Sequence, residues 1–193
     1  SLSPGSCAPI ARVCRVDPYG CGASRDGTLE RPYCEISEAV DGCSGAYLAV
    51  AAQAAGLRYR TELTVTGKTL AVTSIGKGQP VLPAVTVRGN GAMLLLSNVI
   101  VDHANTQGNV VTCRDGAKLR LRQVQARGGD VGVMVDSGCL ELDLSRGLIE
   151  GNDLDGVSIA TGMVRYRIVN SIIARNGRNA QALAAGVSLG RGA

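Results

Sequence analysis

The sequence predicts an all-β chain: a right-handed parallel β-helix with three strands per coil, about five to six coils and a short N-terminal capping helix. Apolar residues recur in matching columns about every 24 residues, and turn dipeptides that contain glycine recur at the same interval. The chain also has no Trp, no Phe and only five Tyr. A core built from stacked aliphatic side chains suits narrow parallel strands that are covered on their inner face.

Two inward columns define the first strand of each coil. Alternate residues of a strand share a face, so columns that lie two residues apart should point into the coil together. The first column contains Leu70, Leu94, Leu119, Leu142 and Tyr166, with separations of 24, 25, 23 and 24 residues. The second contains Val72, Leu96, Leu121, Leu144 and Ile168 at the same separations.

A second strand in each coil follows the same rule. It begins at Leu63, Val85, Val133, Val157 and Val187. One coil leaves two registers open, because either Val110 and Thr112 face inward, or the Asp115-Gly116 turn sets the register and Val111 and Cys113 do so instead. A third strand, seen at 99–101, 148–149 and 172–173, closes a triangular coil.

The N-terminal segment is rich in cysteine, with five of the seven cysteines between Cys7 and Cys43. This number indicates disulfides formed outside the cytosol, and an odd total leaves at least one thiol unpaired. We expect residues 1–46 to form a Cys-rich segment with a helix over 35–40, and residues 47–193 to form the β-helix without a C-terminal cap. We expect Cys21 to pair with Cys34, because the loop between them is polar and contains glycine.

Composition excludes several functions. A single His and the absence of paired C-x2-C spacing disfavour a zinc site, and no run reaches the ~18 apolar residues of a membrane span. A net charge of +4 without aromatic-rich basic stretches gives no reason to expect nucleic acid binding. No charged and apolar leader precedes Ser1, so we expect a secreted or cell-surface protein whose signal is already removed.

Several segments resemble the secreted right-handed parallel β-helix repeat proteins, whose fold is shared with pectate lyases and polysaccharide epimerases. The segments that carry the resemblance are Ile149-Glu-Gly-Asn-Asp-Leu-Asp-Gly-Val-Ser-Ile159, Ile173-Ala-Arg-Asn-Gly177, Gly186-Val-Ser-Leu189 and, upstream, Val16-Asp-Pro-Tyr-Gly-Cys21 and Arg31-Pro-Tyr-Cys-Glu-Ile36. The resemblance implies the fold. It implies no single function, because this architecture carries lyases, hydrolases, epimerases, adhesins and spacers.

Candidate site residues gather at one corner of neighbouring coils. Lyases of this fold hold Ca²⁺ with carboxylates and remove a proton with Arg or Lys. The weak metal candidates are Asp130, Asp153 and Asp155; together with Arg122, Arg127 and Arg175 they form the candidate binding set. Aspartates at turns are usually turn formers, so we expect no cofactor unless this corner holds Ca²⁺.

Outward columns predict how the charges are arranged. Stacking gives Lys118, Glu141 and Arg165 in one column and Arg120, Asp143 and Arg167 in the next, each with an acid between two bases. One coil earlier the outward residues are Met93 and Leu95, and we expect the N-terminal segment to cover them.

His103 beside Asp102 could be a base with its orienting carboxylate, although a solvated corner histidine explains it as well.

We therefore expect a noncatalytic extracellular or cell-surface module that serves as a scaffold or a weak binding surface for acidic polysaccharide. The alternative is a polysaccharide lyase or epimerase. A third hypothesis is an assembly protein that self-associates through its C-terminal coil near Val187 and Leu189.

Overall fold

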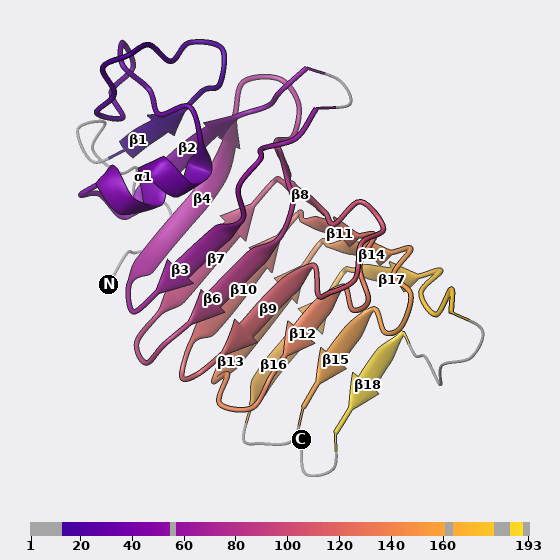
Figure 1. Ribbon diagram of the computed structural model, residues 1–193. Helices are drawn as coiled ribbons and strands as arrows, with labels where there is room; N and C mark the ends of the chain where they lie inside the picture. Colours follow the sequence, from indigo (N-terminus) through magenta and orange to yellow (C-terminus); the bar gives the residue numbers. More distant parts are fainter. Residues whose placement is uncertain (1–12, 55–56, 161–163, 180–185, 191–193) are drawn as a thin grey trace.

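The computed structural model describes residues 13–54, 57–160, 164–179 and 186–190. It is a parallel β-solenoid of about five turns, in which three sheets wrap one core and a single helix of the described residues, α1 (Ile36–Gly42), lies at the N-terminal end (Figure 1). The predicted fold class, with three strands per coil, is confirmed. Among the described residues, no helix is long and apolar enough to cross a membrane.

Each sheet takes one strand from each coil, and all the pairings are parallel. Sheet A contains β1 (Val13–Val16), β2 (Tyr47–Ala51), β4 (Thr69–Ile75), β7 (Met93–Ser97), β10 (Lys118–Arg122), β13 (Glu141–Ser145) and β16 (Arg165–Val169). Sheet B contains β3 (Leu63–Thr66), β6 (Val85–Arg88), β9 (Val111–Arg114), β12 (Val133–Val135), β15 (Val157–Ile159) and β18 (Val187–Leu189). Sheet C contains β5 (Val81–Leu82), β8 (Ile100–Asp102), β11 (Gln125–Arg127), β14 (Leu148–Glu150) and β17 (Ile172–Ala174).

The inward columns of sheet A pair in the predicted register. Leu119 lies between Leu94 and Leu142, and Leu121 lies between Leu96 and Leu144. These leucines are buried, because each contacts its counterpart in the coils before and after it. The aliphatic stack is therefore continuous along the solenoid.

In β9 of sheet B, the register that the sequence left open is set by the Asp115-Gly116 turn and not by Val110. Val111 pairs with Val85 and Val133, and Cys113 pairs with Val87 and Val135. Asp115 and Gly116 both have positive φ, and Ala117 donates its N–H to the carbonyl of Arg114 at 3.2 Å. Only this register lets the inward Cys113 reach Cys139, with which it forms a disulfide inside the solenoid.

The Cys-rich segment extends the solenoid. β1 pairs with β2 at the start of sheet A, and α1 packs against β1 and β3. The expected Cys21–Cys34 disulfide is present, and a second one joins Cys14 to Cys43. Cys7, the remaining cysteine, lies outside the described residues.

Tyr59 fills the N-terminal end of the core. It is fully buried, and its hydroxyl donates to the carbonyl of Ala51 at 2.9 Å. Burial, followed by the charges of Asp17 and Glu35, raises the pKa of this hydroxyl well above its ordinary value. The phenol therefore stays neutral, and the side chain fills the core of the first coil.

The described N-terminal residues do not cover the apolar outer face of sheet A. Leu95 remains 36% exposed, so the described part of the N-terminal segment does not provide the cover expected from the sequence, while residues 1–12 lie outside the described residues. The reason is that β1 takes the edge position beside β2, in the plane of the sheet, rather than folding across its outer face.

Candidate functional site: an ion-pair cleft at one corner

The turns that lead from sheet C to sheet B form the corner of interest, called the C–B corner below. They comprise residues 103–110, 128–132, 151–156 and 175–186, of which 180–185 are not described. Their backbones stack from coil to coil: Asp130 donates its N–H to Gly108 at 2.7 Å, and Asp153 donates to Gly129 at 2.8 Å. This stacking brings side chains of four successive turns together along the solenoid.

A buried asparagine supports this corner from inside. Asn152 is fully buried, and its side-chain amide donates to Oδ1 of Asn176 at 2.8 Å. Its own Oδ1 accepts the backbone N–H of Gly129 at 3.3 Å. Because a buried amide must satisfy its hydrogen bonds, these contacts fix the turns of three coils against one another.

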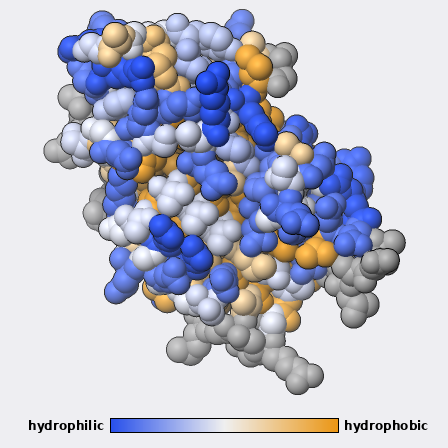
Figure 2. Space-filling model, in the orientation of Figure 1, coloured by the Kyte–Doolittle hydropathy of each residue, from blue (hydrophilic) through white to orange (hydrophobic). Residues whose placement is uncertain are grey.

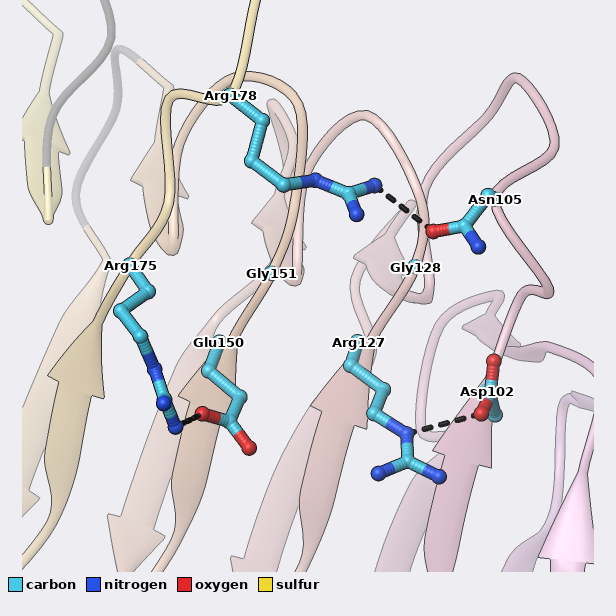
Figure 3. A pocket seen from close by; sticks show the side chains of 8 residues that line it. All are labelled: Asp102, Asn105, Arg127, Gly128, Glu150, Gly151, Arg175 and Arg178. Carbon is cyan, nitrogen blue, oxygen red and sulfur yellow. Dashed lines mark hydrogen bonds and ion pairs between the residues drawn. The ribbon is translucent and has the colours of Figure 1, made fainter.

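A cleft of about 490 Å³ lies on the outside of this corner. Figure 3 shows the eight residues that line it: Asp102, Asn105, Arg127, Gly128, Glu150, Gly151, Arg175 and Arg178. Among the charged residues, three arginines face two carboxylates, so the lining carries a small positive excess.

The charges of the cleft alternate along the outer edge of sheet C. Asp102, Arg127 and Glu150 are direct neighbours in β8, β11 and β14. Nε of Arg127 lies 2.8 Å from Oδ2 of Asp102, while Arg175 pairs with Glu150 (Figure 3). An acid therefore alternates with a base over four successive coils, as on sheet A.

Arg178 closes the cleft from its outer side. Its Nη2 lies 2.9 Å from Oδ1 of Asp153 and donates to Oδ1 of Asn105 at 2.8 Å, 73 residues away in the sequence (Figure 3). One guanidinium thus bridges the turns after β8 and β14. Because its two partners lie in different turns, the position of the Arg178 side chain depends on how these turns stack along the solenoid.

The structure brings together only part of the predicted site. Arg127 and Arg175 line the cleft, and Asp153 adjoins it through Arg178. Arg122 ends β10 on the outer face of sheet A and does not line the cleft. Asp130 accepts the N–H of Gly108 at 2.8 Å, and Asp155 accepts the hydroxyl of Ser188.

The three aspartates do not converge as a metal site. Each has a different partner, and among the described residues no group of three acidic, His or Cys side chains is arranged to hold a metal ion. In this structure Asp130, Asp153 and Asp155 therefore act as turn and ion-pair residues. Turn stacking, which separates the carboxylates by pairing each with its own donor, is the physical reason.

His103 and Asp102 do not form an acid–base pair. The Asp102 carboxylate accepts from Arg127 and from the N–H of Ala104, while Nδ1 of His103 lies 3.2 Å from the carbonyl of Thr106. His103 therefore belongs to its own turn.

Sequence reasoning missed Glu150, Asn105 and Arg178, and it considered Asp102 only as a partner of His103. Asp102, Arg127 and Glu150 are separated by 25 and 23 residues, the same interval as the outward columns of sheet A, so extending the alignment to the third strand would have found them. No such signal exists for Asn105 and Arg178, because they lie in turns of unequal length.

Comparisons of the chain with protein-family models, with curated proteins and with solved structures find no match.

Proposed function

We propose that the chain is a noncatalytic extracellular module of the pectate-lyase-like β-helix type, which binds acidic polysaccharide weakly along the ion-pair cleft. The observation that carries the proposal is the row of partly exposed arginines. The Arg127, Arg175 and Arg178 side chains are 43%, 78% and 45% exposed. A guanidinium has five N–H donors, so each arginine keeps donors that can bind a sugar carboxylate.

The environment of the carboxylates supports binding rather than catalysis. Asp102 and Glu150 are each held by an arginine, so both carboxylates are already engaged in ion pairs. A lyase of this fold would instead need carboxylates that are free to share a cation. The three disulfides are compatible with an extracellular location.

The experiment is a binding titration with polygalacturonate at low and at physiological salt. We expect weak binding that falls as salt rises, because exposed charges are screened. Replacing both Arg175 and Arg178 by Gln should weaken binding about tenfold, a loss of about 1.4 kcal/mol. Arg122→Gln is the matched control, since Arg122 lies outside the cleft and should leave binding unchanged.

The same titration, repeated with added Ca²⁺, distinguishes the binding proposal from the lyase alternative. Added Ca²⁺ should change neither the melting temperature nor the polysaccharide. Unsaturated uronate products that form only with Ca²⁺ would replace the binding proposal with the enzymatic one. Equal loss of binding in the Arg122 control would show that only the overall charge matters.

A second candidate function is self-association through the last coil. Residues that face inward in earlier coils are exposed there: Tyr166 is 45%, Val187 42% and Leu189 51% exposed, whereas Val157 and Ile159 are buried. An exposed apolar cross-section beside an unpaired strand edge favours the addition of another strand.

A further inference from the structure

A second cavity, separate from the ion-pair cleft, lies beside the Cys21–Cys34 disulfide and has a volume of about 340 Å³. Its lining includes Tyr19, Glu35, Gln53, Leu57, Arg58 and Arg60, and it is called the Tyr19 pocket below. This size suits a small ligand such as one or two sugar rings. None of these residues takes part in the function proposed above.

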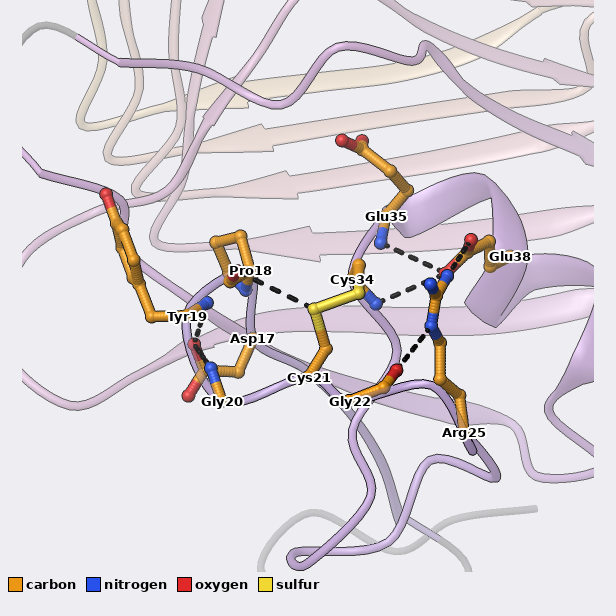
Figure 4. The surroundings of a disulfide bond; sticks show 10 residues. All are labelled: Asp17, Pro18, Tyr19, Gly20, Cys21, Gly22, Arg25, Cys34, Glu35 and Glu38. Atoms are coloured by element: carbon orange, nitrogen blue, oxygen red, sulfur yellow. Dashed lines mark hydrogen bonds and ion pairs between the residues drawn. A yellow bond between two sulfur atoms is a disulfide. The ribbon is translucent and has the colours of Figure 1, made fainter.

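The first observation is an exposed aromatic ring that is held in place. Tyr19 is 62% exposed, yet its hydroxyl accepts the N–H of Ala54 at 2.8 Å. The Asp17 carboxylate accepts the N–H groups of Tyr19 and Gly20, and the adjoining disulfide anchors the loop (Figure 4). The ring therefore loses little conformational entropy when something stacks on it.

The second observation is an unsatisfied acceptor. Oε1 of Gln53 is buried and has no hydrogen-bond partner, although Gln53 lines the pocket. A buried polar atom without a partner costs about 1–3 kcal/mol. Rotation of the Gln53 side chain would bring this amide into the pocket, where a hydroxyl, which both donates and accepts, can pair with its oxygen or its NH₂ group.

The third observation concerns the rest of the lining. Leu57 is 55% exposed and gives the pocket a second apolar surface near Tyr19. The Glu35 carboxylate accepts the backbone N–H of Arg60 and the hydroxyl of Thr61 at 3.3 Å each, and Arg58 donates to the carbonyl of Asp102. Glu35 and Arg58 thus already have protein partners, and the two apolar surfaces beside the Gln53 amide favour a neutral, hydroxyl-rich ligand over an ion.

We propose that the Tyr19 pocket is a binding subsite for a neutral sugar ring. The apolar face of the ring would stack on Tyr19, and its hydroxyls would bind Gln53 and the charged groups of the rim. Arg58 also donates to the backbone carbonyl of Asp102, whose residue lines the ion-pair cleft. The subsite does not depend on acidic polysaccharide binding at the cleft.

The test is a titration of ¹⁵N-labelled protein with neutral hexasaccharides of glucose, mannose and galactose, followed by amide chemical shifts. We expect at least one hexasaccharide to shift the amides of Tyr19, Gly20 and Ala54, and Tyr19→Ala to weaken that binding about tenfold. Tyr166→Ala is the matched control, because Tyr166 is also an exposed tyrosine but lies in β16, far along the solenoid.

Gln53→Met separates a binding role from a structural one. Removing an unsatisfied acceptor should leave the melting temperature unchanged or raise it, while sugar binding falls about fivefold. If no hexasaccharide shifts these amides at about ten millimolar, or Tyr166→Ala weakens binding as much as Tyr19→Ala, the proposal is wrong. It is also wrong if oligogalacturonate shifts the same amides and the neutral sugars do not. Binding of polygalacturonate to the cleft, measured separately, is unaffected by that result.

Discussion

At the scale of single residues, the tightest constraint lies in the glycines that precede the strands of sheet B. A Cβ atom placed on Gly156 would lie 2.4 Å from Cγ2 of Ile173 and 2.6 Å from Nδ2 of Asn176. Gly132 is in the same situation one coil earlier, with Ile149 and Asn152. These glycines are required because the asparagine stack leaves no room for a side chain.

Gly156→Ala should therefore destabilise the fold by about 1–3 kcal/mol, because the partly buried Ile173 and Asn176 cannot move aside without losing contacts, including the hydrogen bond between Asn176 and Asn152. Urea unfolding measures the loss. Gly22→Ala is the control, since a Cβ atom added at Gly22 would have no other atom within 4 Å and the φ of Gly22 is not positive. Equal stability of the two variants would mean that the asparagine stack is looser than described.

Glu38 links the disulfide loop to α1. Its carboxylate pairs with Arg25 and accepts the N–H groups of Cys34 and Glu35 at 3.2 and 3.4 Å (Figure 4). Burial acts to raise the pKa of Glu38, but the hydrogen bonds from Arg25 and the backbone outweigh it, so the pKa lies below its ordinary value. The ionised carboxylate therefore stabilises the folded state.

The sign of this shift predicts the pH dependence. The contribution of Glu38 is fully present above its ordinary pKa and is lost as pH falls through the lower, folded-state pKa. Glu38→Gln should be less stable than the parent at neutral pH by under about 1 kcal/mol, because the pair is partly exposed. That difference should vanish on acidification, whereas exposed Glu30→Gln shows none; a difference independent of pH would contradict this assignment.

At the scale of elements, the outer face of sheet A changes from apolar to charged along the solenoid. Leu95 pairs with Arg120, so an apolar outward position gives way to the charged column of Arg120, Asp143 and Arg167. Figure 2 shows the opposite side of the solenoid from sheet A, with pale residues over sheet B and blue ones near the C–B corner. On sheet A, the change from apolar to charged outward positions occurs between β7 and β10.

Glu141→Lys tests the charged columns. Glu141 lies between Lys118 and Arg165, and its Oε1 is 2.9 Å from Nη2 of Arg120. The substitution should lower the free energy of unfolding by about 0.5–1 kcal/mol in low salt, with a smaller loss in high salt. Urea titrations at both salt concentrations measure it, with Glu30→Lys as the control. A loss that does not depend on salt would mean that packing, not charge, is responsible.

At the scale of the whole molecule, the sequence predicted what repeats and missed what does not. The leucine columns, the capping helix and the Cys21–Cys34 bond followed from periodicity and local composition. The Cys113–Cys139 bond depended on the register of one strand, which the sequence left open. The bridge from Arg178 to Asn105 depended on turns of unequal length, which periodicity does not describe.

The exposed last coil predicts concentration-dependent association. Gly190 donates its N–H to Ile159, and alternate residues of a parallel strand face the same neighbour, so Ser188 also faces β15. The N–H groups of Val187 and Leu189 therefore face away from β15, and no strand of the described residues lies on that side. Leu189→Lys should reduce association in sedimentation velocity, whereas Thr86→Lys, on the outer face of sheet B, should not. A parent chain that stays monomeric at high concentration would exclude this route.

The connections between sheets differ in a way that bears on how new specificities arise. Sheet A joins sheet C through two residues in every coil from β7 onward, with Asn98, Gln123, Arg146 and Asn170 at positive φ. The links from sheet C to sheet B that follow β8, β11, β14 and β17 instead contain eight, five, six and twelve residues. Insertions and deletions at the C–B corner therefore leave the coil register intact, while a change of one residue in the A–C bend would turn the side chains of the next sheet C strand to the opposite face. The corner that carries the cleft is the place where loops can be exchanged, by evolution or by grafting, to change the ligand without rebuilding the solenoid.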